Sequence, residues 1–183
     1  MTLGPAFPDT LQAARAGAPW AWTTLYRDLA PAVTGYLRAH GAREPEDLTS
    51  EVFVAVVRGL GDFKGDEAGF RSWVFVIAHR RLLDERRRNF RHPVDLVPTY
   101  VVDTPVEGAD VEALARVSVE QIRALFSRLT DDQRDVLLLR IVAGLTVEEI
   151  AEAVGKRAGA VKALQRRGLA ALARIISKEA VPP

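Results

Sequence analysis

The chain has 183 residues, of which 48% are hydrophobic and 27% charged, so it is long enough for one ordinary domain or two small helical ones. It contains no cysteine, which excludes disulfide scaffolds, thiolate zinc sites and cysteine nucleophiles and fits a reducing compartment. No apolar run approaches the roughly 20 residues of a membrane span, and the first residues lack the layout of a secretion signal. We therefore expect a soluble, cytoplasmic protein with no membrane span.

The net charge of +1 conceals a strong segregation of charge along the chain. Residues 71–91 carry seven arginines against two acids, a net +5, and residues 156–178 carry seven lysines and arginines and no acid, a net +7. Between them, residues 95–120 carry six acids against one arginine, a net −5. Two basic segments around an acidic one indicate two contacts with a polyanion, with ordinary solvated helix faces as the alternative.

The apolar periodicity predicts an all-α fold without strands. The first part of the chain is expected to form a three-helix unit after an N-terminal segment, residues 1–19. A glycine at position 41 and a proline at position 45 mark the boundary between the first two helices. The predicted helices cover residues 20–40, 45–60 and 70–88.

The second part of the chain is predicted to be a four-helix unit, with helices at about 111–128, 131–143, 147–154 and 158–176. Capping boxes begin two of them, at Thr130 to Gln133 and at Thr146 to Glu149. Prolines and the absence of an apolar period predict an irregular linker between the two units. The expected divisions are an N-terminal segment (1–19), two small helical domains (20–90 and 111–176), the linker (91–110) and a C-terminal tail (177–183).

The last two helices have the order of a helix-turn-helix motif, with Gly155 in the turn. At 100° per residue, one face of helix 158–176 is apolar, and the opposite face combines basic and small side chains. Small residues let such a helix approach DNA, and Lys or Arg can then bond guanine edges or phosphates. The alternative is a surface helix with incidental charge. The apolar face contains Val161, Leu164, Gly168, Leu172 and Ile175, and the basic face contains Lys162, Ala163, Arg166, Arg167, Ala170 and Arg174.

Helix 45–60 has more apolar residues than one buried face requires. Leu48, Val52, Phe53, Val56 and Leu60 can share one wide face, whereas Val54 projects among charged residues. An exposed valine is common and usually has no function. An apolar contact with a polar rim is also how a helix docks on a partner, and both interpretations stay open.

Helix 70–88 carries Trp73, Arg80, Asp84 and Arg87 along one lateral stripe. A tryptophan beside guanidinium groups offers an unpaired nucleic-acid strand a stacking surface and neutralisation of its phosphates. The preceding loop, residues 62–66, could shape a pocket for an extruded base. The alternative is that Trp73 is a half-buried packing residue.

Two blocks of the sequence stand out together. The first comprises residues 25–37, 46–53 (EDLTSEVF) and 70–78 (FRSWVFVIA), and the second comprises residues 129–151, ending in GLTVEEIA, and 159–162 (GAVK). The first block resembles region 2, and the second resembles region 4, of the sigma-70 family of bacterial RNA polymerase sigma factors. The compact layout with an irregular linker is similar to the extracytoplasmic-function (ECF) group.

This resemblance implies an initiation factor that binds core RNA polymerase, recognises the −10 and −35 promoter elements and promotes DNA melting. Helix 45–60 would dock on the clamp coiled coil of the largest subunit through Asp47, Leu48, Ser50, Glu51 and Val54. Recognition and melting of the −10 element would use Phe63, Lys64, Phe70, Arg71, Trp73, Arg80, Asp84 and Arg87. The −35 element would meet Lys162, Ala163 and Arg166 near its bases and Arg157 and Arg167 at its phosphates. Further implied partners are the flap of the second-largest subunit and an anti-sigma factor, although no residue identifies the latter.

A stand-alone helix-turn-helix regulator is the competing function, but it leaves helix 45–60 and the Trp73 stripe without a role. Catalysis is not expected, because no phosphate-binding loop or nucleophile elbow is present and the three histidines lack zinc-ligand spacing. We therefore expect no catalytic residue, no metal site and no cofactor.

Overall fold

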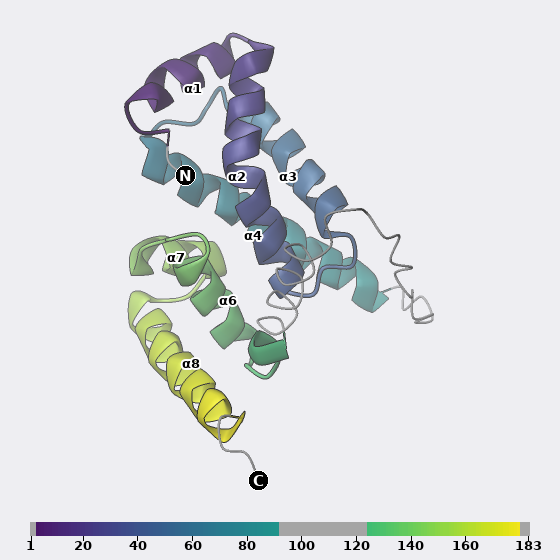
Figure 1. Ribbon diagram of the computed structural model, residues 1–183, viewed down its shortest axis with the longest axis vertical. Helices are drawn as coiled ribbons and strands as arrows, with labels where there is room; N and C mark the ends of the chain where they lie inside the picture. The colour runs from purple at the N-terminus through teal and green to yellow at the C-terminus, as the bar shows by residue number, and fades with distance from the viewer. Residues whose placement is uncertain (1–2, 92–123, 180–183) are drawn as a thin grey trace, which may run out of the picture.

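The computed structural model describes residues 3–91 and 124–179, and every regular element in these ranges is a helix (Figure 1). The predicted all-α class is therefore confirmed. Residue 91, the first of the predicted linker, is helical, and residues 92–110 lie outside the described residues. Most of the helix predicted at 111–128 also lies outside them, although residues 124–127 are helical.

The N-terminal segment contains a helix that the sequence analysis did not predict. A short 3-10 turn, Gly4–Ala6, leads into α1, Phe7–Arg15. Phe7, Leu11 and Ala14 are buried and recur at helical spacing, so this one face attaches α1 to the rest of the molecule. The sequence analysis placed residues 1–19 in an N-terminal segment and assigned no helix to it.

Helices α2 (Pro19–Ala39), α3 (Pro45–Gly59) and α4 (Glu67–Arg91) form the first group together with α1. Both α2 and α3 begin at a proline, whose fixed φ suits the first turn and whose missing N–H would have no helical partner there. The expected wide face of α3 is confirmed, since Leu48, Val52, Phe53, Val56 and Leu60 are all buried.

Helices α6 (Asp131–Ile141), α7 (Val147–Val154) and α8 (Ala158–Glu179) form the second group. Both predicted capping boxes are present: the Thr130 and Thr146 side chains each accept from the N3 backbone, and the N3 side chain accepts from the cap. Gly155 ends α7 in the left-handed conformation (φ 66°), which glycine adopts without a steric cost. Helix, glycine turn and helix thus have the predicted helix-turn-helix order.

The two groups pack against each other through α2 and α6 and through α4 and α7. Figure 1 shows α6 and α7, in green, next to the lower end of α2 and the first half of α4. α8, from green to yellow, extends away from this contact toward the C-terminus. This contact could not be predicted from the sequence, because its residues come from helices far apart in the chain.

Candidate functional site

The exposed side of α3 forms a shallow depression of about 440 Å³. Four residues predicted to bind polymerase line it: Asp47, Ser50, Glu51 and Val54. The Val54 side chain is 48% exposed and supplies the apolar part, with two carboxylates beside it. Leu48, the fifth predicted residue, is 4% exposed and belongs to the core beneath this surface. We call the depression the α3 surface.

Two arginines that line the α3 surface are not among the residues predicted to bind polymerase. Arg58 follows Val54 by one helical turn, and Arg81 reaches the depression from α4. Helical spacing alone places Arg58 on the side of Val54. Arg81 could not be found from the sequence, because its place depends on how α4 packs against α3.

The loop between α3 and α4, residues 60–66, holds its aromatic residue inward. Phe63 is 9% exposed, and its ring stacks on Trp73 with centroids 5.2 Å apart and an interplanar angle of 27°. Phe70, 1% exposed, contacts both rings at 5.4 and 5.8 Å. Gly59 permits this packing, since a Cβ there would lie 2.9 Å from the Trp73 ring. One face of Trp73 is thus covered by Phe63, and Lys64 is the exposed cation of the loop.

The remaining members of the predicted α4 stripe face solvent. Arg80, Asp84 and Arg87 are exposed. Asp84 Oδ1 lies 3.4 Å from Arg87 Nη1, an exposed ion pair of small energy that solvent or a phosphate can replace. This stripe therefore offers two guanidinium groups at the surface of α4.

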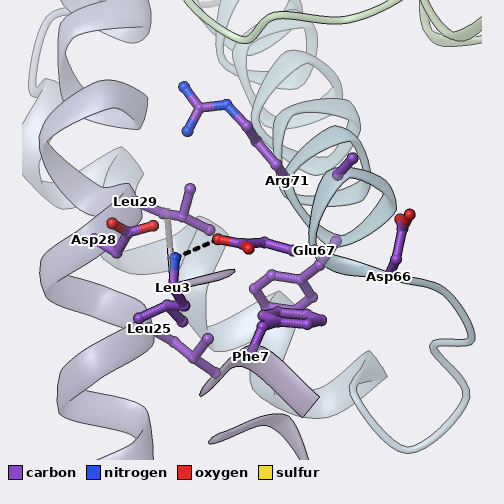
Figure 2. A pocket seen from close by; sticks show the side chains of 10 residues that line it. Leu3, Phe7, Leu25, Asp28, Leu29, Asp66, Glu67 and Arg71 are labelled. Atoms are coloured by element: carbon purple, nitrogen blue, oxygen red, sulfur yellow. Dashed lines mark hydrogen bonds between the residues drawn. The ribbon is translucent and has the colours of Figure 1, made fainter. Parts of the chain in front are cut away.

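Arg71 points toward the second group of helices. Its Nε donates to the carbonyl oxygen of Ala143 and its Nη2 to that of Val142, both at 2.8 Å. Figure 2 shows its side chain directed away from Glu67, one turn earlier on the same helix. Arg71 therefore bonds protein carbonyls in this conformation and is not presented to a ligand.

A second polar contact between the groups lies one residue further along α4. The Ser72 hydroxyl donates to Glu149 Oε1 at 2.6 Å. The other oxygen of the same carboxylate accepts from the N–H and hydroxyl of Thr146, at 2.7 and 2.8 Å, as part of the capping box of α7. These hydrogen bonds lower the pKa of Glu149.

A third polar contact is buried between α2, α4 and α6. His40 Nδ1 lies 3.1 Å from Arg86 Nη2 and 3.3 Å from Asp135 Oδ1. Burial lowers the pKa of His40 to about 2 and raises that of Asp135 to about 6, while Arg86 opposes the rise at Asp135. His40 is therefore neutral, and the charged partner of the aspartate is the Arg86 guanidinium, 3.8 Å away.

His79 lies beside this cluster and is also buried. Its Nδ1 is 2.9 Å from the Tyr36 hydroxyl. Burial lowers the pKa of His79 to about 4 and raises that of Tyr36, so both groups are neutral near pH 7. His79 belongs to the packing of α2 against α4, whereas its neighbour Arg80 is exposed.

Helix α8 separates its faces as its periodicity predicted. Val161, Leu164 and Gly168 are buried, and Leu172 and Ile175 are half-buried. On the opposite face, Ala163 is half-buried and the remaining residues of the predicted basic face are exposed. Arg157, in the turn, is exposed, and the neighbouring Lys156 Nζ pairs with Asp132 Oδ2 at 2.9 Å. The exposed basic residues of this surface, the α8 surface, are Arg157, Lys162, Arg166, Arg167 and Arg174.

Within residues 3–91 and 124–179, no cluster of three or more His, Asp or Glu side chains has a metal-binding arrangement. Among the helices described in these ranges, none is both long and apolar enough to cross a membrane. The candidate binding sites of the described residues are therefore the charged surfaces of α3, α4 and α8.

Two family models match the chain in succession. Residues 25–92 match sigma-70 region 2, and residues 119–172 match sigma-70 region 4. The ECF RNA polymerase sigma factor ShbA of Streptomyces griseus is 35% identical over 133 residues, which cover 69% of each chain. The ECF sigma factor BldN of Streptomyces coelicolor is 31% identical over 179 residues, which cover 94% of this chain and 66% of BldN.

Two solved structures share the fold. CnrH, in complex with the cytosolic domain of CnrY, aligns over 96% of this chain and 99% of its own with a TM-score of 0.69 and 22% identity. RpoE of Bartonella quintana, in complex with the anti-sigma factor NepR, aligns over 85% of this chain and 96% of its own with a TM-score of 0.63 and 18% identity. Both sigma-70 family models match this chain in order, and the two relatives above are ECF sigma factors. The chain therefore belongs to the sigma-70 family of RNA polymerase sigma factors, in its ECF group.

Proposed function

We propose that this chain is an ECF-type sigma factor that binds core RNA polymerase, recognises the −10 and −35 promoter elements and promotes DNA melting. The observation that carries the proposal is the succession of a region 2 match and a region 4 match in one chain. A stand-alone regulator requires only the helix-turn-helix part and leaves the region 2 match and the α3 surface without a role. The site of action would be the cytoplasm, where polymerase and promoter DNA are found.

The α3 surface would dock on the clamp coiled coil of the largest polymerase subunit. Val54 provides an exposed apolar contact, and the carboxylates of Asp47 and Glu51 and the guanidinium groups of Arg58 and Arg81 surround it. An apolar centre with a charged rim is the usual composition of a protein interface. Charges of both signs at the rim would set the orientation of the partner.

The −10 element would be bound by loop 60–66 and α4. Lys64, Arg80 and Arg87 are exposed and would neutralise phosphates of the unpaired strand. On the face that Phe63 covers, Trp73 would accept a base only after Phe63 has moved, because the two rings are stacked. Arg71 would reach DNA only after its bonds to Val142 and Ala143 have broken. Binding of this element therefore requires a rearrangement of the conformation described above.

The −35 element would be read in the major groove by the α8 surface. Lys162 and Arg166 would face base edges, with Ala163 between them leaving room for close approach, and Arg157 and Arg167 would contact phosphates. The helices α2–α4 and α6–α8 would belong to two domains, at 20–90 and 111–176, joined by the linker at 91–110. The linker would pass through the polymerase, and the second domain would also contact the flap of the second-largest subunit.

An anti-sigma factor is the proposed regulator. The support comes from the two solved relatives, which were each captured with a further protein, named as an anti-sigma factor in the case of NepR. Such a partner would hold the two groups of helices together and so oppose the rearrangement that promoter binding requires.

The test is native co-elution of the purified chain with bacterial core RNA polymerase, followed by run-off transcription on genomic fragments. We expect co-elution and new, discrete start sites. Glu51→Arg should weaken co-elution because it reverses a charge beside Val54, whereas Glu152→Arg, an exposed reversal on α7, should not. Tight binding to duplex DNA without any binding to core polymerase would instead indicate a stand-alone regulator.

A further inference from the structure

Arg15, the last residue of α1, is bonded to the loop between α3 and α4. Its Nη2 donates to the carbonyl oxygen of Phe63, and its Nε donates to that of Leu60 at 3.4 Å. These two carbonyls stand on either side of the turn formed by Gly61 and Asp62. One guanidinium group therefore fixes both ends of the first half of loop 60–66.

The backbone of this half of the loop makes two further hydrogen bonds, from Asp62 N–H to the Gly59 carbonyl at 3.2 Å and from Phe63 N–H to the Leu60 carbonyl at 3.3 Å. The side chains of Leu60 and Phe63 are buried, whereas Gly61, Asp62 and Lys64 are exposed. Leu60 also directly follows α3, where helix carbonyls carry partial negative charge and a cation is favoured. The Arg15 bonds therefore add to the packing of Leu60 and Phe63 in holding the loop backbone in place.

The other end of the N-terminal segment is attached directly after the same loop. Glu67, the first residue of α4, accepts from the backbone N–H groups of Leu3 and, at 2.8 Å, Gly4 (Figure 2). The Phe7 ring lies 5.6 Å from Phe70, the residue on which Phe63 packs. The N-terminal segment is thus attached to the first half of loop 60–66 and to the residue directly after the loop. This segment precedes the region 2 match, which begins at residue 25.

We propose that α1 is part of the promoter-melting apparatus and that Arg15 is a positioning residue for loop 60–66. The inference rests on the proposed function, in which this loop meets the −10 element. Arg15 bonds only backbone carbonyls, so it can hold the loop backbone in place while the Phe63 side chain turns away from Trp73. A backbone that does not have to be ordered when the unpaired strand is captured favours melting. Docking on core polymerase uses the α3 surface, whose lining residues include none of α1, and should not depend on Arg15.

The experiment compares holoenzymes that contain the wild type, Arg15→Ala, Arg15→Lys or Arg27→Ala, with Arg27 as an exposed control on α2. Run-off transcription is measured on a duplex promoter and on the same promoter with a premelted −10 region. We expect Arg15→Ala to lower duplex transcription by about tenfold, the effect of one or two lost hydrogen bonds. On the premelted template the loss should be smaller, because capture of a strand that is already unpaired does not also have to open the duplex. Arg15→Lys, which keeps the charge but not the paired N–H donors of the guanidinium, should fall between.

Equal losses on both templates, or no loss on the duplex, would overturn the role of Arg15. If the wild type itself gave no polymerase-dependent transcription, the proposed function would be wrong. A second measurement then tests separately whether Arg15 holds loop 60–66. Amide hydrogen exchange of the free protein should be faster across residues 61–66 in Arg15→Ala than in the wild type or Arg27→Ala, with α3 unchanged. Unchanged exchange in the loop would show that Arg15 does not hold it.

Discussion

Replacing Arg71 with alanine should shift the chain toward a form in which α6–α8 separate from α1–α4. Arg71 makes two hydrogen bonds to carbonyls of the second group, both at 2.8 Å. A bond from a charged donor contributes about 1.5–3 kcal/mol. Because Arg71 is only half-buried, the lower value applies to each bond and the pair contributes about 3 kcal/mol. Since about 1.4 kcal/mol corresponds to a factor of ten, the ratio of separated to packed molecules should rise by about a hundredfold.

The absence of cysteine makes this shift measurable by energy transfer between two dyes. Cysteines introduced at Thr23 on α2 and Ser177 on α8, both exposed, would be the only labelling sites. We expect lower transfer efficiency in Arg71→Ala than in the parent, and no change in Arg88→Ala, an exposed arginine on the same helix. Equal transfer in the parent and Arg71→Ala, with both folded by circular dichroism, would refute the reasoning.

Three further predictions concern stability and DNA binding. Thr130→Ala removes the cap of α6 and should lower the free energy of unfolding by about 1 kcal/mol in urea denaturation, and an unchanged value would contradict the cap. Lowering the pH from 7 to 5 should cost about 2 kcal/mol of stability, measured in the same way. In the folded protein His40 and His79 stay neutral over this range, whereas in the unfolded chain they bind protons below about pH 6.5, which favours unfolding. Asp135 has a raised pKa and binds a proton more readily in the folded protein, so it offsets part of this loss. A flat profile would show that these histidines are not buried. Lys162→Ala should reduce initiation from −35-dependent promoters by the equivalent of about 1–3 kcal/mol if a base contact is lost, and unchanged transcription would remove Lys162 from the base-reading set.

Local signals in the sequence predicted the helices well. Prolines at helix starts, capping boxes and Gly155 act within a few residues, so their outcome can be read without knowing the fold. The exposed position of Val54 and the two faces of α8 also follow from helical periodicity alone. For these elements the structure agrees with the expectation residue by residue.

The features that could not be predicted from the sequence depend on contacts between segments that are distant in the chain. Arg71 bonds two backbone carbonyls that are more than 70 residues away in the chain. Every residue has a backbone carbonyl, so no sequence pattern shows which ones a side chain will bond. Phe63 lies in a loop without periodicity, so its inward position could not be distinguished from the exposed position expected of a DNA contact. Arg15 belongs to α1, a helix that was not predicted because its apolar period is short.

The two carboxylate oxygens of Glu149 have different structural roles. One oxygen closes the cap of α7 with Thr146, and the other receives the hydroxyl of Ser72 from the first group. Losing Ser72 therefore leaves the cap complete, and water can replace the single bond that is broken. Separation of α7 from α4 would therefore not uncap the helix-turn-helix, and the α8 surface would keep the form in which it is proposed to meet DNA.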